Sequence, residues 1–298
     1  MRFFKSNFKI IVIVLSAMTL LVGGIFAINL WEKQNTFPTD PDFEVDKTIS
    51  YNGKTYVYNK NIETFLVIGL DSLGEDVSGD SYRNDKRADF LVLFVFDNDT
   101  QRCSAIQINR DTVTEMNILG VAGQKVGTVT QQIALSYSYG NGKEVSSRNT
   151  ADSVAHLLFD VKVNHYASVT MEAVPLYNDF VGGVELEILD DFTGIDDTLI
   201  KGEKITLNGE QALTYIRSRQ GLPDATNVKR MARQKQYMTA LYNKTKALSE
   251  NNDKFIVDAA TTVADYFVSD TSTNRLETIF QKISNYDFEG FVDRKSVV

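Results

Sequence analysis

Asp89-Phe-Leu-Val-Leu-Phe-Val-Phe96 is apolar at every position after the aspartate. A strand that is apolar without alternation is typical of a sheet covered on both faces. Thr64–Leu70 and Arg102–Ile108 are predicted as two further strands. The turn residues Asp97-Asn-Asp-Thr100 separate the strand that starts at Asp89 from the strand at 102–108. These segments predict the middle of a sheet that has other elements packed on each side.

Helical patterns interleave with strands along the rest of the chain. Two more strands are predicted at 165–170 and 184–189. The predicted helices are 129–139, 149–159, 172–180, 208–215, 227–248, 253–267 and 274–283. Alternating elements of this kind predict the α/β class, with a central mixed β-sheet flanked by helices on both faces. A segment of about 240 residues fits one domain with one sizeable core.

The first thirty residues predict a membrane anchor. Residues 10–30 carry no charge and are rich in Ile, Val and Leu, and their number is enough to span a bilayer as a helix. Arg2, Lys5 and Lys9 precede them, and positive residues stay on the cytoplasmic side. We therefore expect a cytoplasmic tail at 1–9 and a C-terminal domain outside the cell membrane. A cleaved signal peptide is the alternative, but no clear Ala-x-Ala site is present.

The outer part divides into three segments. Residues 31–60 predict a stalk followed by a short β-hairpin with Asn52-Gly53 at its turn. Residues 61–250 contain the strands and helices of the main domain. Residues 251–298 are expected to add helices that pack on that same domain.

Cysteine and histidine offer little for catalysis. The chain has one cysteine and two histidines, so an internal disulfide is excluded. Cys103 falls in a predicted strand and is expected to pack in the core. His156 and His165 show neither metal-ligand spacing nor an evident serine partner. A zinc site and a histidine-based hydrolase are therefore disfavoured.

Two arginine-rich segments stand out in a chain of net charge −8. Tyr215-Ile-Arg-Ser-Arg219 is followed by Arg230-Met-Ala-Arg-Gln234. Arg230, Arg233 and Gln234 are spaced to share one helix face, whereas Arg217 and Arg219 would point the same way only in extended chain. Forked guanidinium groups match phosphate oxygens in pairs, so the cluster predicts a phosphate or pyrophosphate site. The alternative is a solvated basic face that pairs with nearby acids.

Charged residues also mark the ends of the predicted strands. Asp71 and Arg110 each follow a strand, and Asp89 opens one. An antiparallel neighbour returns its start to the same edge of the sheet, so we expect these three residues to lie near one another. Two carboxylates beside substrate phosphate oxygens suit Mg²⁺.

Five segments in order resemble the LytR-CpsA-Psr family. They are Phe65-Leu-Val-Ile-Gly-Leu-Asp71, Arg87-Ala-Asp89, Ile108-Asn-Arg-Asp-Thr112, Val181-Gly-Gly-Val184 and Asn208-Gly-Glu-Gln-Ala-Leu-Thr-Tyr-Ile-Arg-Ser-Arg219 with Arg230-Met-Ala-Arg-Gln234. Each motif is weak alone, but their order and spacing over roughly residues 60 to 245 are specific. The chain departs from the family pattern at Asn109, where Pro is common, and at Asn227, where Asp is usual. Ala88 and Phe90 also replace Ser and Thr around Asp89.

The resemblance implies an extracytoplasmic enzyme of Gram-positive type bacteria. It would move a glycopolymer, such as a teichoic acid or a capsular polysaccharide, from a polyprenyl-pyrophosphate carrier to peptidoglycan. Residues 61–250 would be its catalytic domain, with Mg²⁺ or Mn²⁺ on Asp71 and Asp89 and with Arg110 as a further catalytic residue. The implied pyrophosphate-binding residues are Arg87, Arg110, Arg217, Arg219, Arg230, Arg233 and Gln234. An apolar slot for the lipid is implied as well, with candidates Phe90, Phe94, Phe96, Leu135, Val174, Leu176 and Phe180.

Two other functions stay open at this stage. One is a lipid-pyrophosphate sensor or regulatory module without turnover, and the other is a pyrophosphatase acting on the same lipid. Direct binding of nucleic acid is disfavoured, because an acidic domain outside the membrane lacks the broad basic surface that such binding needs.

Overall fold

The computed structural model describes residues 48–70, 84–249, 252, 254–271 and 286–292. The chain divides into two units, residues 1–58 and residues 59–298. The predicted tail, anchor and most of the stalk lie outside the described residues. Within the described ranges, no helix has the length and apolar character needed to cross a bilayer.

The first unit contains the hairpin that the sequence predicts. β1 (Thr48–Tyr51) pairs antiparallel with β2 (Lys54–Val57). Asn52 and Gly53 form the turn with φ of 50° and 71°. Positive φ at both central residues is the geometry that asparagine and glycine tolerate best, which explains this turn sequence.

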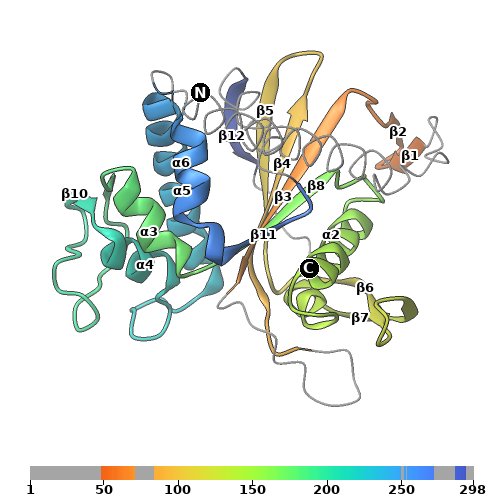
Figure 1. The fold of residues 1–298 in the computed structure, drawn as a ribbon, viewed down its shortest axis with the longest axis horizontal. Helices are drawn as coiled ribbons and strands as arrows, with labels where there is room; N and C mark the ends of the chain where they lie inside the picture. Colours follow the sequence, from red (N-terminus) through yellow and green to blue (C-terminus); the bar gives the residue numbers. More distant parts are fainter. Residues whose placement is uncertain (1–47, 71–83, 250–251, 253, 272–285, 293–298) are drawn as a thin grey trace, which may run out of the picture. The chain divides into compact units, whose positions relative to one another are not determined.

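A six-stranded mixed sheet forms the centre of the second unit (Figure 1). Its order is β11 (Phe267–Ser269), β8 (His165–Thr170), β3 (Ile62–Leu70), β4 (Ala88–Asp97), β5 (Arg102–Ile108) and β12 (Asp287–Val292). The pairs β3/β8 and β5/β12 are parallel, and the other three neighbours are antiparallel. The α/β class and the mixed sheet are therefore confirmed.

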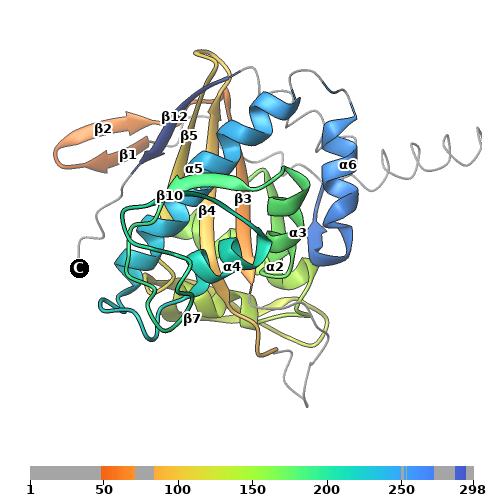
Figure 2. The ribbon, with the colours of Figure 1, turned by 90° about the vertical axis from the view of Figure 1, so that its left-hand side faces the viewer.

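Helices lie on both sides of this sheet (Figures 1 and 2). On one side, α2 (Glu144–Leu157) and the 3₁₀ helix η1 (Ile133–Ser138) share a buried core with Leu66, Ile68 and Leu93. On the other side, the sheet presents aromatic residues, and Phe288 packs on Tyr242 of α5 (Asn227–Ser249) with 4.7 Å between ring centroids.

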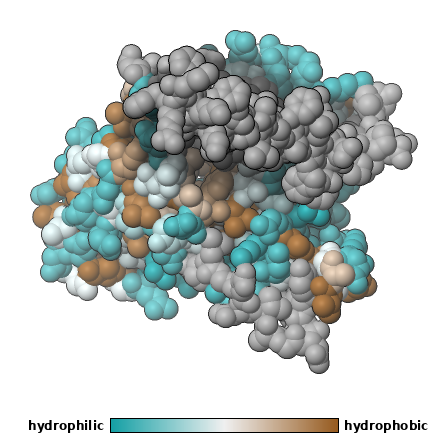
Figure 3. All heavy atoms as spheres, in the orientation of Figure 1, coloured by the Kyte–Doolittle hydropathy of each residue, from teal (hydrophilic) through white to brown (hydrophobic). Residues whose placement is uncertain are grey.

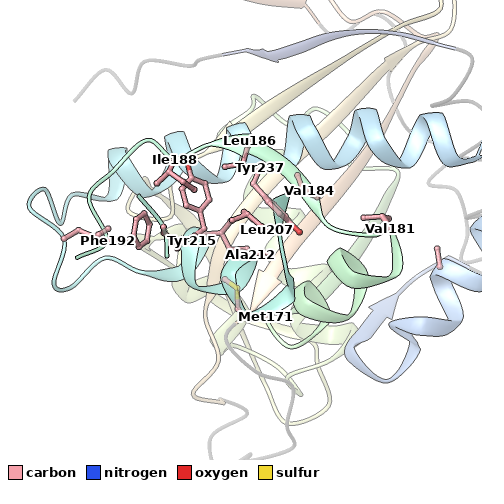
Figure 4. Close-up of a cluster of buried hydrophobic side chains, with 14 of the residues drawn as sticks. Met171, Val181, Val184, Leu186, Ile188, Phe192, Leu207, Ala212, Tyr215 and Tyr237 are labelled. Atoms are coloured by element: carbon pink, nitrogen blue, oxygen red, sulfur yellow. The ribbon is translucent and has the colours of Figure 1, made fainter. Parts of the chain in front are cut away.

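A second core lies among the helices on the α5 side (Figure 4). It joins α3 (Ala173–Phe180), α4 (Gly209–Arg217), α5, α6 (Phe255–Thr262) and the small sheet of β9 (Val184–Glu187) and β10 (Lys204–Leu207). Asn208 caps α4, and it forms a reciprocal capping box with Gln211. The Val181-Gly-Gly-Val184 motif is explained by Gly183, where φ is +80° and an added Cβ would lie 2.7 Å from the Leu207 carbonyl oxygen.

The helix predicted at 129–139 is wrong for residues 129–132, which end a strand, and the residues after them form only a short 3₁₀ helix. Residues 113–132 form a hairpin of β6 (Val113–Leu119) and β7 (Lys125–Gln132), followed by η1. β7 alternates exposed and half-buried residues with a period of two, which is the pattern of an exposed hairpin strand rather than of a helix. The α2 helix begins at Glu144, five residues before the predicted start at 149.

The C-terminal segment was predicted to hold helices alone, at 253–267 and 274–283; the first is confirmed only as the shorter α6, and the second lies outside the described residues. After α6 the chain passes through a short 3₁₀ helix, η2 (Ala264–Tyr266), into β11, and β12 comes near its end. These strands form the two edges of the central sheet, so 251–298 completes the sheet rather than only covering it. The sequence signal was weak because β11 has only three residues and β12 contains Gly290 at a bulge.

Cys103 lies in the core as predicted and should be chemically inert. Its side chain is buried beside Phe96 and Tyr286, and burial raises its thiol pKa to about 12. The thiolate is the reactive form, so the folded protein should resist iodoacetamide at about pH 8, whereas the unfolded chain should react. Mass spectrometry before and after denaturation checks this expectation. Full alkylation of the folded protein would contradict the burial of Cys103.

Candidate functional site

Asp89 lies at a bulge near the start of β4. Gly69 pairs with Phe90 and Leu70 with Ala88, which leaves Asp89 without an opposite residue on β3. The bulge also brings Phe90 close over Gly69, where an added Cβ would lie 2.7 Å from that of Phe90. Bulges of this kind re-aim a side chain, often beside active sites.

Arg110 follows β5 at the same edge of the sheet. Its Nη1 forms an ion pair with Oδ1 of Asp89, and the two side chains are 15 % and 8 % exposed. Its Nε lies 3.6 Å from Oδ1 of the more exposed Asp111. The expectation that an antiparallel neighbour brings Asp89 to Arg110 is confirmed. Asp71 lies outside the described residues.

Arg230 comes to this edge from the first turn of α5. It is 8 % exposed, and its Nη2 donates to Oδ1 of Asn227 at 2.7 Å. Its Nε is buried and has no hydrogen-bond partner among the described residues. Burial lowers the pKa of this guanidinium, Asp89 opposes the shift, and the charges of Arg110 and Arg219 add to it. Arg230 therefore belongs to the same charge cluster as Asp89 and Arg110, with one buried donor unused.

Arg233 and Gln234 face different partners. Arg233 is 1 % exposed, and its Nε donates to the Tyr215 carbonyl at 2.8 Å. Its Nη1 pairs with Asp190 and its Nη2 donates to the Ser218 carbonyl. The guanidinium also lies 5.5 Å from the ring centroid of Phe192. Gln234 Nε2 donates to the Ile216 carbonyl. Both residues thus hold the C-terminal end of α4 against α5.

The other predicted arginines are exposed. Arg217 is in the last turn of α4, and the helix ends at Ser218 with ψ of 134° before Arg219, so the predicted break is confirmed. Arg87 precedes β4. No hydrogen bond or ion pair joins the side chains of Arg87, Arg217 or Arg219 to another described residue. These three arginines have donors available to a ligand.

Asn84 supports the segment that carries Arg87 and was missed in the sequence. Its Nδ2 donates to the Tyr137 and Gly140 carbonyls and to the Ser146 hydroxyl, at 3.0–3.2 Å. Its Oδ1 accepts from the Lys86 amide. A single asparagine in a polar loop carries no sequence pattern that would distinguish this role.

Of the two carboxylates expected from the sequence to bind a divalent cation, the structure describes Asp89. Asp89 is a hard oxygen donor beside an arginine cluster, which fits a cation bound together with phosphate oxygens. No group of three His, Cys, Asp or Glu side chains that would hold a metal occurs within the described ranges. Asp71, the other expected ligand, is not among them.

The residues expected to line an apolar slot separate into several groups. Phe90 and Phe94 are half-buried on the α5 side of β4, and Phe94 packs with the buried Phe96 in the aromatic cluster. Val174 and Phe180 pack on the second core, Leu176 is 40 % exposed, and Leu135 is half-buried in η1. In the space-filling view, hydrophobic residues gather near the centre of the face shown (Figure 3).

Residues 31–290 match the LytR_cpsA_psr family. The chain belongs to this family. It is 28 % identical over 240 residues to the polyisoprenyl-teichoic acid–peptidoglycan teichoic acid transferase TagU of Bacillus subtilis, which covers 80 % of this chain and 71 % of TagU. TagU of Enterococcus faecalis is 26 % identical over 277 residues, 92 % of this chain and 82 % of that protein. The five resembling segments thus identified the family correctly.

Solved structures share the LytR-CpsA-Psr fold seen here. B. subtilis TagV has a TM-score of 0.57 at 22 % identity and covers 78 % of this chain and 84 % of its own. TagT bound to LIIa-WTA has a TM-score of 0.56 at 20 % identity, with 78 % of each chain covered. These similarities support the mixed sheet with helices on both sides.

Proposed function

We propose that the protein is a transferase that moves a glycopolymer from a polyprenyl-pyrophosphate carrier to peptidoglycan. The observation that carries the proposal is the buried Arg230 Nε, which has no hydrogen-bond partner among the described residues and lies beside the Asp89–Arg110 pair. A buried donor left unpaired is costly, and a phosphate oxygen would satisfy it. The TagU relatives, named as teichoic acid transferases, support the reaction class.

The charge balance of the site fits a pyrophosphate. Arg110, Arg219 and Arg230 stand against Asp89 and Asp111 within one electrostatic cluster. The exposed Arg87 and Arg217 would add two further cations when substrate binds. Each charge-assisted hydrogen bond contributes about 1.5–3 kcal/mol, so several together would hold a pyrophosphate firmly.

Arg233 and Gln234 take a supporting part in this proposal. Arg233 uses all three of its nitrogen atoms in hydrogen bonds within the protein. We assign to both residues the support of the segment 217–219 that carries the two exposed arginines. They would act on the pyrophosphate through those arginines.

We further propose that Asp71 and Asp89 hold Mg²⁺ or Mn²⁺. The cation, when bound, supplies charge neutralisation at the phosphate oxygens. The described residues contribute orientation and hydrogen bonds: Arg110 fixes the Asp89 carboxylate, and Arg230 approaches from α5. In a phosphoryl transfer of this type, positioning and charge stabilisation provide most of the rate enhancement.

The transfer itself balances as a displacement at phosphorus. An acceptor hydroxyl oxygen of peptidoglycan bonds to the phosphorus that bears the glycopolymer, and the bond from this phosphorus to polyprenyl phosphate breaks. Polyprenyl phosphate leaves with the electron pair, and the hydroxyl proton passes to solvent. The half-buried Phe90 and Phe94 beside the charged edge would receive the lipid chain.

The proposed setting is the outer face of the cell membrane, with residues 10–30 as the anchor. A carrier lipid remains in the bilayer, so an anchored enzyme meets it without leaving the surface. TagT bound to LIIa-WTA is among the structural relatives, and wall teichoic acid is our preferred polymer for this chain.

The test uses the full chain in detergent with a polyprenyl-pyrophosphate glycan, Mg²⁺ and peptidoglycan fragments. Attachment of glycan to peptidoglycan, followed by mass spectrometry, is the expected result. Release of the phosphoglycan without attachment, both with and without acceptor, would favour a pyrophosphatase. Binding without any product would favour a sensor, and the transferase proposal would then be wrong.

A further inference from the structure

Two asparagine side chains join the β5 end to the start of α5. Asn227 Nδ2 donates to Asn109 Oδ1 at 2.6 Å, across 118 residues of sequence. At the start of α5, Thr226 Oγ1 accepts from the Lys229 amide and so takes the capping contact. The side chain of Asn227 is therefore available for the contact with Asn109 and for a second contact with Arg230.

The hydrogen bonds run in series from Asp111 through Asn109 and Asn227 to Arg230, and the two outer donors fix the direction of each bond. The backbone N–H of Asp111 donates to Asn109 Oδ1 at 3.0 Å, and a backbone amide can only donate. The Arg230 guanidinium donates to Asn227 Oδ1 at 2.7 Å, and it too can only donate. Asn109 must therefore present its oxygen to Asn227, and Asn227 must present its nitrogen to Asn109.

Residue 227 consequently has to donate to one partner and accept from the other. An asparagine amide does both, whereas an ionised aspartate can only accept. An aspartate here would set a carboxylate oxygen against Asn109 Oδ1 at the position where the 2.6 Å contact lies. Asn109 would have to turn its amide and give up the bond from Asp111.

The amide also leaves the charge of Arg230 uncompensated by residue 227. Asn227 holds one nitrogen of the guanidinium, and the buried Nε is left without a described partner. A carboxylate at 227 would pair with Arg230 and lower the positive potential of the cluster. The neutral contact orients the guanidinium while its charge remains available to an anion.

We propose that Asn109 and Asn227 form an amide bridge that positions Arg230 for the pyrophosphate without neutralising it. The inference rests on the proposed function, because it takes the pyrophosphate as the anion. Asn227 is the positioning residue, and Asn109 fixes the direction of its amide. The bridge spans the two segments that bring Arg110 and Arg230 to the site, so it also sets their separation.

The test compares Asn227→Asp, Asn109→Ala and the double variant in the full chain. Inhibition by inorganic pyrophosphate, KM, kcat and the thermal midpoint are measured for each. Asn227→Asp should weaken pyrophosphate inhibition about 10-fold, as expected when one charge-assisted contact is compensated, and should lower the thermal midpoint. Adding Asn109→Ala should restore part of the midpoint, because the opposing oxygen is gone, but should not restore the affinity.

Asn98→Asp is the matched control. It adds the same charge in the turn between β4 and β5, at the opposite end of these strands from Asp89. It should leave pyrophosphate inhibition unchanged. Wild-type inhibition in Asn227→Asp, with wild-type transfer intact, would overturn the bridge alone. A wild-type protein that neither binds pyrophosphate nor transfers glycan would overturn the proposed function and, with it, the inference.

Discussion

Replacing Arg110 with alanine is expected to lower kcat/KM for glycopolymer transfer by about 10²–10³-fold, the usual effect of removing one preorganised donor from a developing negative charge. Arg110 is the cation in direct contact with Asp89 at the sheet edge. Its loss removes a contact to the phosphate and leaves the Asp89 carboxylate, 8 % exposed, to repel the substrate. Transfer assays at saturating lipid substrate give kcat, and assays at limiting lipid substrate give kcat/KM.

The fold has to be separated from the chemistry in this experiment. Removing one partner of a buried ion pair costs about 3–5 kcal/mol, and the figure is an upper bound here because Arg110 retains some solvent contact. Arg110→Lys keeps the charge but loses the planar fork. It should keep most of the stability of the wild type and still lose most of the activity.

Arg102 provides the control on the same strand. It begins β5, whereas Arg110 follows the end of that strand, and its ion pair with Glu289 is 53 % and 43 % exposed. Exposed pairs contribute about 0–1 kcal/mol, so Arg102→Ala should retain activity and nearly full stability. Transfer by a folded Arg110→Ala protein at the wild-type rate would exclude Arg110 from catalysis.

The meeting of Asp89 with Arg110 could be predicted because it depends on strand order alone. Apolar runs locate β3, β4 and β5, and short connections make β4 and β5 antiparallel neighbours. The start of one strand then lies beside the end of the next. The bulge at Asp89 was not predictable, since an unmatched residue leaves the apolar pattern of β4 almost unchanged.

The hairpin of β6 and β7 shows where pattern reasoning fails. Val129 to Tyr139 contains apolar residues that also suit a helix face, and the competing alternation of β7 is weak because its inward residues are only half-buried. The amide bridge was beyond prediction for another reason. Asn109 and Asn227 look like two separate departures from a motif, and only the fold places them in contact.

Arg230 and Arg233 illustrate the limit of helical spacing. Positions three apart share a face of α5, so both were predicted to bind pyrophosphate. Spacing says nothing about what lies opposite each residue. The carbonyl groups at the end of α4 and the Asp190 carboxylate meet Arg233, whereas Arg230 meets the charged edge of the sheet.

Arg233→Ala is therefore expected to lower the stability of the domain rather than to inactivate a site that stays folded. The substitution leaves the Asp190 carboxylate, 12 % exposed, without its cation and two backbone carbonyls without their donor. Losses of this kind cost about 3–5 kcal/mol, which corresponds to a fall of roughly 10 °C in the melting temperature for a domain of this size. Thermal unfolding followed by circular dichroism measures the shift.

Arg230→Ala is the matched comparison one turn earlier in the same helix, and it should behave in the opposite way. Within the described part of the chain the buried Arg230 Nε has no hydrogen-bond partner, so removing the guanidinium relieves part of its desolvation cost and the melting temperature should change little. Transfer activity should nevertheless fall about 10²-fold, because the freed volume holds no cation for the phosphate. If instead Arg230→Ala melted early and Arg233→Ala stayed stable but inactive, the two arginines would have exchanged roles, and the pyrophosphate would have to lie on the α4 side of the helix.

Pyrophosphate itself distinguishes the two arrangements. It should raise the melting temperature of the Arg233→Ala protein, whose binding groups remain, and should raise that of Arg230→Ala far less.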